Sequence, residues 1–551
     1  MKLTGSQILL ECFKEQNVDT IFGFPGGAVL FIYDELYKQL DKFNHILTSH
    51  EQGAAHAADG YARSTGKVGV CIATSGPGAT NLVTGLATAY MDSIPMVAIT
   101  GNVGVPLLGR DSFQEIDITG VTAPVTKHNY IVKDVTKLAD IIREAFYIAK
   151  DGRPGPVLID IPKDVTNKLS EYTKTKPREI IRHTKNILDV DIEKAAKLIS
   201  KAKKPYIYAG GGVVISDARD ELVKFAEKIE APVTCSLMAM GGFPGQHELY
   251  TGMIGMHGTK ASNIGVQNCD LLIAIGARFS DRVTGNTAKF ARGAKIIHID
   301  IDPAEINKNV KTNHHIIGDV KEVLDKLNMA VSKQDNKEWL QEIKELSTKY
   351  PLKYPEGLTG QYAIEKLYEV TKGNAIITTE VGQHQMWAAQ YYKFSETKRF
   401  FTSGGLGTMG YGTGAALGAQ AGNPGKLVVN IAGDGSFRMN LNEMITAARF
   451  KLPIKVLVIN NHVLGMVRQW QTIFYDNRYS FTNLNDINYE SLADAFGVKA
   501  IIIDKKEDVE RKLKEAIEME GPVIINCLID KDEMVYPMVA PGAPIDDLIT
   551  E

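Results

Sequence analysis

Three doubly wound α/β domains with parallel sheets are the fold that this sequence predicts. The chain of 551 residues is too long for one hydrophobic core, and it corresponds to about three domains at the usual ~150 residues each. Short apolar runs alternate with helical patterns along three blocks of the chain, which is the pattern of βαβ units. Two polar stretches, residues 166–191 and 332–360, separate these blocks and contain charges and prolines typical of linkers.

The two linkers predict the domain boundaries. We expect an N-terminal domain over residues 1–170, a central domain over 190–332 and a C-terminal domain over 358–551, the last with a closing tail. We expect the central domain to be Rossmann-like.

An internal repeat relates the first and third blocks. Lys67 precedes an apolar run and then Gly76, and Lys426 precedes an apolar run and then Gly435 at the same spacing. Chance similarity between α/β domains is the alternative, but the matched spacings favour two copies of one strand-loop-helix-strand unit.

Composition excludes several classes of function. Hydrophobic residues at 44% and charged residues at 23% are typical of an ordinary soluble protein. The formal net charge of -3 gives no electrostatic case for binding nucleic acid or an anionic membrane. Five scattered cysteines without a CxxC pair favour a reducing compartment and argue against zinc. We therefore expect a cytoplasmic protein, without a signal peptide or an apolar run of the ~18 residues that a membrane span needs.

Two polar motifs follow neighbouring apolar runs in the third block. Asp434 lies between two glycines after the first run, and Asn461 ends the pair Asn460-Asn461 after the second. Because the carboxyl ends of parallel strands open on one edge, we expect Asp434 and Asn461 to lie side by side. Their hard oxygen atoms suit Mg2+, which is usually bound together with substrate phosphates. A tight strand-to-helix turn is the alternative interpretation of Gly-Asp-Gly alone.

The first block lacks the acidic ligand of the third block, and it carries a different acid before its first matched strand. Glu51 opens a helix of small residues that runs to Arg63. The structural alternative is an acid placed in the first helical turn by the helix dipole. In the central block, glycine-rich turns at 210–212 and Gly276 follow apolar strands, and Asp300 ends a later strand, where an acid can bond a ribose hydroxyl. The GxGxxG pattern at 405–410 lacks a clear preceding strand, so we do not interpret it as a dinucleotide site.

Several short motifs of the sequence resemble motifs in the large catalytic subunits of the acetohydroxyacid synthase (acetolactate synthase) family, which belongs to the thiamine diphosphate enzymes. They extend along nearly the whole chain. The motifs are GFPGGAVLFIYD (23–34), SHEQGAAHAADGYAR (49–63), SGPGATN (75–81), DSFQE (111–115), GRPGPVLIDIPKDV (152–165), GARFSDRVTG (276–285), GLGTMGYG (405–412), GDGSF (433–437) and MVRQWQ (466–471). Most occur across thiamine diphosphate enzymes, whereas GARFSDRVTG with MVRQWQ indicates the biosynthetic, FAD-containing branch.

The resemblance implies a reaction and its partners. Two 2-keto acids would condense with loss of CO2 through a thiamine-bound hydroxyethyl carbanion, as the first common step of branched-chain amino-acid biosynthesis. The products would be 2-acetolactate or 2-aceto-2-hydroxybutyrate. Thiamine diphosphate, Mg2+ and a structural FAD are the implied cofactors. A homodimer or homotetramer with active sites between subunits is implied, and a small regulatory subunit stays open. A pyruvate oxidase or decarboxylase on the same scaffold is the alternative function.

The resemblance also assigns roles to individual residues. Glu51 would bond the aminopyrimidine ring, Met409 would force thiamine into its bent form, and Arg282 would bind the second keto acid, unless it forms only a surface ion pair. The resemblance assigns the metal to Asp434, Asn461 and the backbone of Val463, and the diphosphate to Gln383, His384, Gly407, Gly435 and Ser436. It assigns FAD to Arg153, His257, Gly258, Thr259, Gly276, Arg278, Asp300 and Asp319. Gln114 and Lys163 would act in catalysis beside Glu51 and Arg282, and the substrate pocket would contain Gly27, Phe113, Met466 and Trp470.

Overall fold

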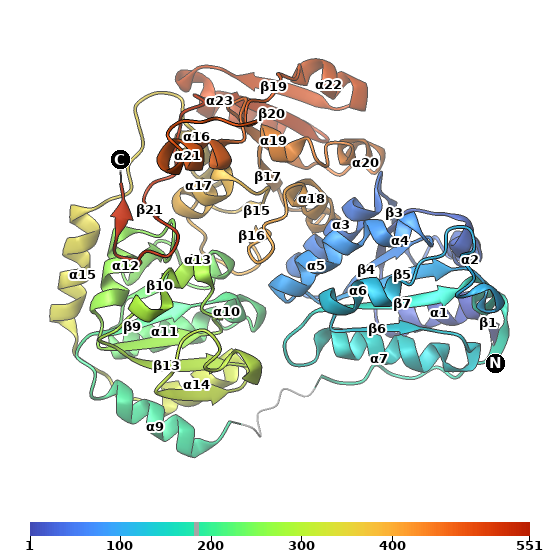
Figure 1. Ribbon diagram of the computed structural model, residues 1–551, viewed down its shortest axis with the longest axis horizontal. Coiled ribbons are helices and arrows are strands. Elements are labelled where there is room, and N and C mark those ends of the chain that lie inside the picture. Colours follow the sequence, from blue (N-terminus) through green and yellow to red (C-terminus); the bar gives the residue numbers. More distant parts are fainter. Residues whose placement is uncertain (181–186, 551) are drawn as a thin grey trace.

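A computed structural model describes residues 1–180 and 187–550 of the chain. Residues 181–186 of the predicted first linker and residue 551 at the end of the third domain lie outside the described part. Within it, the chain forms three six-stranded parallel sheets, each with helices on both faces (Figure 1). The predicted α/β fold class is therefore confirmed, whereas the exact domain boundaries stay a prediction.

The N-terminal sheet has the strand order β3-β2-β4-β5-β7-β6. Its strands are β2 (Thr20–Gly23), β3 (Asn44–Leu47), β4 (Gly69–Ala73), β5 (Met96–Asn102), β6 (His128–Ile131) and β7 (Pro156–Pro162). Its helices are α1 (Gly5–Glu15), α2 (Leu30–Tyr37), α3 (Glu51–Thr65), α4 (Pro77–Asn81), α5 (Val83–Asp92), α6 (Ile118–Thr122), α7 (Leu138–Lys150) and α8 (Lys163–Asn167). The short strands β1 (Lys2–Thr4) and β8 (Leu169–Glu171) pair antiparallel.

The C-terminal sheet has the order β16-β15-β17-β18-β20-β19. Its strands are β15 (Ile376–Thr379), β16 (Phe400–Phe401), β17 (Val428–Gly433), β18 (Lys455–Asn460), β19 (Lys499–Ile503) and β20 (Val523–Leu528). Its helices are α16 (Gly360–Thr371), α17 (Gln383–Tyr391), α18 (Tyr411–Gly422), α19 (Asp434–Phe437), α20 (Glu443–Arg449), α21 (Gly465–Phe474), α22 (Tyr489–Phe496) and α23 (Val509–Glu518). In both sheets the second, first, third, fourth, sixth and fifth strands of the domain lie side by side, so the predicted repeat is confirmed as a shared topology.

The central sheet has a different order, β11-β10-β9-β12-β13-β14, in which the third, second, first, fourth, fifth and sixth strands are neighbours. This is the order of dinucleotide-binding folds, as expected for a Rossmann-like domain. Its strands are β9 (Pro205–Ala209), β10 (Val233–Cys235), β11 (Tyr250–Met253), β12 (Leu271–Ile275), β13 (Lys295–Asp300) and β14 (His314–Ile317). Its helices are α9 (Asp189–Ile199), α10 (Gly211–Ile215), α11 (Arg219–Ile229), α12 (Lys260–Asn268), α13 (Asp281–Thr284), α14 (Val320–Ala330) and α15 (Lys337–Lys349). Among the described helices, none is long and apolar enough to cross a bilayer.

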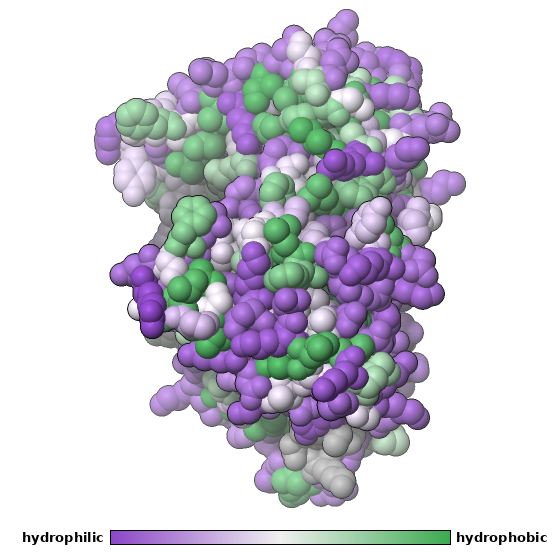
Figure 2. Space-filling view, turned by 90° about the vertical axis from the view of Figure 1, so that its right-hand side faces the viewer, coloured by the Kyte–Doolittle hydropathy of each residue, from purple (hydrophilic) through white to green (hydrophobic). Residues whose placement is uncertain are grey.

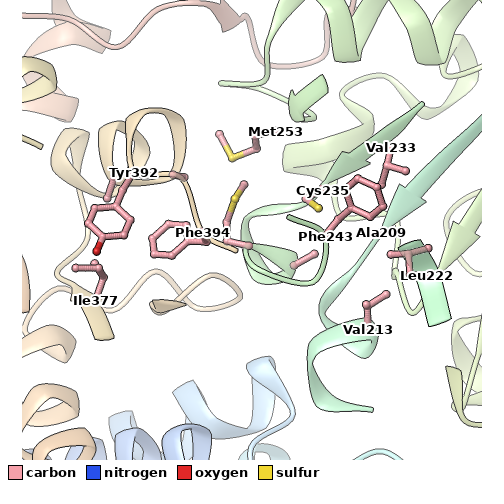
Figure 3. Packing of buried hydrophobic residues seen from close by; sticks show 14 of the residues in the cluster. Ala209, Val213, Leu222, Val233, Cys235, Phe243, Met253, Ile377, Tyr392 and Phe394 are labelled. Carbon is pink, nitrogen blue, oxygen red and sulfur yellow. The ribbon is translucent and has the colours of Figure 1, made fainter. Parts of the chain in front are cut away.

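The central and C-terminal domains share one hydrophobic core. Phe243 of the central domain and Tyr392 and Phe394 of the C-terminal domain belong to the same buried cluster (Figure 3). The tail that follows β20 crosses between these two domains, with β21 (Met538–Val539) paired to β22 (Leu548–Ile549). The backbone N–H of Val539 donates to the Met256 carbonyl over 2.8 Å, so the tail is fixed to the central domain.

The N-terminal and C-terminal domains meet through α3 and α18, which lie side by side (Figure 1). A Cβ atom added at Gly60 of α3 would lie 2.1 Å from the Ala415 carbonyl oxygen. One added at Gly418 of α18 would lie 1.8 Å from the Ala57 carbonyl oxygen. The two helix backbones are therefore in direct contact, and only glycine fits at these positions.

We predict that Gly418→Ala destabilises the protein by about 1–3 kcal/mol, because the new methyl group overpacks the helix contact. Intrinsic helix propensity alone would instead favour alanine by about 1 kcal/mol, so the sign of the change is informative. Denaturant unfolding would measure it.

Gly425→Ala is the matched control, because a Cβ there would meet no atom within 4 Å. A Gly418→Ala protein as stable as the Gly425→Ala protein would contradict the close contact of the two helices.

Candidate active site

Asp434 and Asn461 lie at the carboxyl ends of two paired strands, β17 and β18, with Gly433 opposite Ile459 in the register. The prediction that parallel pairing brings these strand ends to one edge is confirmed. Both side chains are buried, with 1% of Asp434 and 6% of Asn461 exposed. The Val463 N–H donates to Asn461 Oδ1 over 3.2 Å, so the three predicted metal ligands are neighbours along this edge.

The Asp434 carboxylate is short of partners. Its Oδ2 atom is buried and has no hydrogen-bond partner among the described residues, and Arg438 Nη2 lies 3.9 Å away. Burial raises the pKa of Asp434 to about 6, although the charge of Arg438 acts in the opposite direction. A bound cation would supply the missing charge, so the residues present fit the predicted magnesium site.

The helix α17 brings two predicted diphosphate residues to the same edge. Gln383 opens this helix, and its Oε1 accepts a hydrogen bond from Asn461 Nδ2 over 3.3 Å. Its Nε2 donates to Gln469 Oε1 over 3.0 Å and to the Glu533 carbonyl over 2.7 Å. Burial lowers the pKa of His384 to about 3, so this imidazole is neutral. Its ring packs so closely on Gly433 that a Cβ there would lie 2.7 Å from Nδ1.

The loop before α18 contains the predicted Gly407 and Met409. Gly407 is exposed with φ +74°, and a Cβ atom there would meet nothing within 4 Å. Met409 is half-buried. Gly410 N–H donates to Glu380 Oε2 over 2.8 Å, and Ser436 Oγ donates to the same oxygen over 3.0 Å. Glu380 therefore connects the loop to the start of α19.

Glu380 was missed in the sequence analysis. Its signal was an acid directly after the apolar run of β15, the same arrangement that identified Asp434. Gly435 next to Ser436 packs tightly, since a Cβ there would lie 2.7 Å from Leu464 Cδ2.

Glu51 lies in the N-terminal domain, at the first position of α3, with 9% of the residue exposed. Its Oε2 accepts a hydrogen bond from Asn81 Nδ2 over 2.9 Å. The start of α3 is fixed from the C-terminal domain, because Glu443 Oε1 accepts the N–H groups of Ser49 and His50 over 3.1 and 3.0 Å. Among the described residues, the carboxyl group of Glu51 itself hydrogen-bonds within its own domain.

Other predicted residues surround this edge of the N-terminal sheet. Gly27 follows β2 and is exposed, and Lys163 follows β7 with its Nζ 5.9 Å from the Phe31 ring centroid. Gln114 has a φ of +59°, and its carbonyl oxygen would lie 2.9 Å from a Cβ at Gly76. Phe113 beside it is 87% exposed, so this loop presents an aromatic ring outward.

The predicted substrate residues of the other two domains lie on α21 and α13. Met466 and Trp470 are half-buried on α21, and Trp470 packs edge-on against Phe474 with ring centroids 5.5 Å apart. The Arg282 side chain is 62% exposed and lies 3.5 Å from Asp281. The structure thus shows Arg282 in the surface ion pair that was the alternative interpretation.

The predicted flavin residues gather on the central domain. Gly276 follows β12 with φ +58° and packs on Gly212, where a Cβ at 276 would lie 2.6 Å from the Gly212 Cα. Asp300 ends β13 and is buried. Gly258 packs on the backbone of Gly255. Next to it, Thr259 caps α12.

Four further predicted flavin residues contact protein groups. His257 Nδ1 lies 3.2 Å from the Pro537 carbonyl oxygen, and burial lowers the pKa of His257 to about 4. The Arg278 carbonyl accepts a hydrogen bond from Asn309. Asp319 caps α14 and accepts from Ser216 Oγ over 2.7 Å. Arg153 pairs with central-domain carboxylates, as described next.

Arg153 joins the N-terminal domain to the central domain. Its Nη1 donates to Asp302 Oδ2 over 3.2 Å and to Glu305 Oε1 over 2.8 Å. Its Nε donates to Ser93 Oγ over 2.8 Å. Arg153 thus reaches the central domain and ends on two of its acidic residues, while its predicted role at the flavin stays a prediction.

Comparison with known proteins identifies the three domains. The thiamine pyrophosphate enzyme N-terminal TPP binding domain matches residues 3–121, the central domain matches 192–327 and the C-terminal TPP binding domain matches 380–527. The acetolactate synthase large subunit of Porphyra purpurea is 48% identical over 98% of this chain and 94% of that protein. The acetolactate synthase large subunit of Corynebacterium glutamicum is 49% identical over 99% of this chain and 90% of that protein.

The chain belongs to the acetolactate synthase large-subunit family. The isozyme 2 large subunit of Escherichia coli K12 is also similar, with 45% identity over 99% of both proteins. The family predicted from the sequence motifs is thus confirmed, and so is its place among thiamine pyrophosphate enzymes. The roles of individual site residues stay predictions.

We predict that Asp434→Asn stabilises the metal-free protein at pH 7.5. A raised pKa means that the folded protein favours the protonated acid, so this group stabilises the fold at low pH. That contribution is lost as the pH rises from the ordinary value of 3.8 through about 6. Removing the charge should therefore add about 1–3 kcal/mol at pH 7.5 and almost nothing at pH 4.

Denaturant unfolding in the presence of a chelator, at both pH values, would measure this difference. The same variant should lose the stabilisation that Mg2+ and thiamine diphosphate together give the parent protein. A variant less stable than the parent at pH 7.5 without metal would contradict the assignment of Asp434 as an uncompensated carboxylate.

Proposed function

We propose that this chain condenses two 2-keto acids with loss of CO2, forming 2-acetolactate from two pyruvates or 2-aceto-2-hydroxybutyrate from pyruvate and 2-oxobutyrate. This would be the first common step of branched-chain amino-acid biosynthesis. The observation that carries the proposal is the near-complete alignment with acetolactate synthase large subunits at 45–49% identity. The presence of Glu51, Asp434 and Asn461 at their expected places supports it.

The C-terminal domain would hold thiamine diphosphate and Mg2+. When bound, the coenzyme supplies a nucleophilic carbon and an electron sink. Asp434, Asn461 and the Val463 carbonyl would ligate the metal. Gln383, His384, Gly407, Gly435 and Ser436 would surround the diphosphate, and Met409 would support the bent coenzyme. The orphaned oxygen of Asp434 is the feature of the structure that supports this assignment.

The N-terminal domain would supply the proton chemistry. Glu51 is nearly buried, and within the described parts of the chain its Oε2 accepts a hydrogen bond from the neutral amide of Asn81. Its other oxygen is near Gly78, where a Cβ atom would lie 3.1 Å from Glu51 Oε1. We assign Glu51 the role of exchanging a proton with a ring nitrogen of the aminopyrimidine, since a carboxyl group can act as a general acid or base when it lies within hydrogen-bond reach of the reacting group.

The substrate pocket would combine residues from three places. Gly27, Phe113, Gln114 and Lys163 come from the N-terminal domain, Met466 and Trp470 from α21, and Arg282 from the central domain. Arg282 is exposed enough to turn toward a keto-acid carboxylate. The Trp470 indole would limit the size of the side chain on the second keto acid.

The central domain would bind FAD in a structural role, because the net reaction is not a redox reaction. Its strand order and the close backbone contact between Gly276 and Gly212 support a dinucleotide site. We assign His257, Gly258, Thr259, Gly276, Arg278, Asp300, Asp319 and Arg153 to this site. Flavin absorbance of the purified protein, lost after acid treatment and recovered with added FAD, would test the assignment.

A second copy of the chain would complete the active site. The Glu51 carboxyl and the Asp434 edge belong to different domains, and within the described residues no hydrogen bond joins them. The surface on the side of the N-terminal domain carries several hydrophobic patches (Figure 2). Exposed Phe113 and Phe481, at 87% and 97%, lie on loops of the N-terminal and C-terminal domains. We propose a homodimer or homotetramer in the cytoplasm, joined by a small subunit as the relatives' name "large subunit" implies.

Product identity tests the proposed function directly. The purified protein should convert pyruvate to acetolactate only when thiamine diphosphate and Mg2+ are added. Acetaldehyde as the main product would instead indicate a decarboxylase, and oxygen consumption would indicate an oxidase.

We predict that Glu51→Gln lowers kcat by at least about tenfold to a hundredfold, as expected for loss of a general acid-base, while thiamine diphosphate still binds. Steady-state rates together with calorimetric titration of the coenzyme would measure both effects.

Asp140→Asn is the control, since Asp140 occupies the first turn of α7 and its side chain is 85% exposed. It tests the effect of losing a helix N-terminal charge together with one contact to Arg143. Equal rates for the Glu51→Gln and Asp140→Asn proteins would remove the catalytic role of Glu51.

A further inference from the structure

A buried ion cluster lies between the N-terminal and C-terminal domains. Arg63 of α3 donates through Nε to Asp59 Oδ1 over 2.6 Å and through Nη2 to Asp92 Oδ2 over 2.9 Å. The side chains of Arg63, Asp59 and Asp92 are 6%, 0% and 1% exposed. Burying three ionised groups is unfavourable unless each is well paired, so the other contacts of this cluster are informative.

Those contacts end on the loop that contains Gly407 and Met409. Asp92 Oδ1 accepts the Gly405 N–H over 2.7 Å, and Asp92 Oδ2 accepts the Gly404 N–H over 3.2 Å. Arg63 Nη1 donates to the Thr402 carbonyl over 3.1 Å. The Asp92 carboxylate thus accepts hydrogen bonds from two successive backbone N–H groups of the loop. The Arg63 guanidinium, which neutralises this carboxylate, donates to the carbonyl of Thr402 before them.

The far end of the loop is fixed from the same domain. Tyr411 Oη donates to Asp59 Oδ1 over 2.6 Å, and the hydroxyl groups of Thr88 and Thr408 are 2.7 Å apart. Between these anchors, Leu406 is 44% exposed and Gly407 faces open space. The N-terminal domain therefore fixes both ends of the loop and leaves its centre accessible.

Steric fit supports a specific role for Asp92. A Cβ atom at Gly405 would lie 2.8 Å from Asp92 Oδ1 and 2.9 Å from Met91 Cβ. Any side chain at position 405 would push the loop away from the carboxylate. The close approach at Gly405 and the two N–H bonds to Asp92 thus depend on each other.

We propose that Asp92, held by Arg63, is a positioning residue for the coenzyme loop 403–410, so that the N-terminal domain of a chain sets the shape of the coenzyme site on its own C-terminal domain. This inference rests on the proposed function in that the loop is taken to contact thiamine diphosphate. Asp92 does not touch the coenzyme and acts through the backbone of Gly404 and Gly405.

The test uses Asp92→Asn in the full-length protein. The amide keeps the shape but can accept through only one oxygen, so one loop N–H loses its partner. We expect the dissociation constant for thiamine diphosphate, measured by calorimetry with saturating Mg2+, to rise about tenfold. The KM for pyruvate at saturating coenzyme should stay within about twofold, because the pocket residues are untouched.

Glu15→Gln is the matched control. Glu15 is a buried carboxylate of the same domain that pairs with Arg143 Nε over 2.8 Å and has no contact with the loop. It should lower thermal stability as Asp92→Asn does and leave coenzyme affinity unchanged. Coenzyme affinity that is unchanged in Asp92→Asn, or weakened equally in both variants, would overturn the positioning role.

Thr88→Val provides a second test, which does not alter a buried charge. It tests the positioning of the loop even if the Asp92→Asn protein fails to fold. It removes the Thr88–Thr408 hydroxyl contact and should weaken coenzyme binding about threefold or more. Unchanged binding would overturn the proposal. Parent protein that fails to bind thiamine diphosphate would instead refute the proposed function itself, so the two failures are distinguishable.

Discussion

The contact between α3 and α18 depends on the absence of side chains. At Gly60 and Gly418 the backbone of one helix occupies the space where the other would place a Cβ atom. Interiors are packed densely and tolerate little added volume, so this contact fixes the distance between two domains. The Glu51 carboxyl lies at the start of α3, and the loop with Gly407 and Met409 leads into the start of α18. The position of each depends on the same helix pair.

The first and third sheets share one strand order, and the proposed roles in catalysis are divided between their two domains. Both sheets present their strand ends as ligand-binding edges. In the C-terminal domain that edge contains Asp434 and Asn461, which suit a hard cation. In the N-terminal domain Glu51 follows β3, one strand earlier in the chain than the counterpart of β17, and it bonds to Asn81. In the proposed function, two copies of one architecture would thus provide a metal site and a proton-transfer site.

Patterns local in the sequence predicted much of the structure. The adjacency of the strand ends that carry Asp434 and Asn461 follows from two short motifs and the geometry of parallel strands. The family was predicted from short sequence motifs. Each of these depends on residues close in the chain or on a regular strand spacing.

Contacts between domains could not be predicted in this way. Arg63 and Asp92 lie near the ends of two helices, and nothing near them in sequence indicates that they meet Thr402 and Gly405. The ion pairs of Arg153 with Asp302 and Glu305 likewise depend on how two domains pack. Glu380 had a local signal in its place after β15, but its hydrogen-bond partner Gly410 lies 30 residues further along the chain, so the contact itself could not be predicted.

The separation of Glu51 and Asp434 on different domains has a genetic consequence for the proposed assembly. A chain lacking one of these carboxyl groups still contributes an intact surface carrying the other. Co-expression of two alleles, each inactive alone and damaged in a different domain, would then yield mixed dimers with one fully native centre. Such a gene would show intragenic complementation between its first and last thirds, and none between two alleles damaged in the same third.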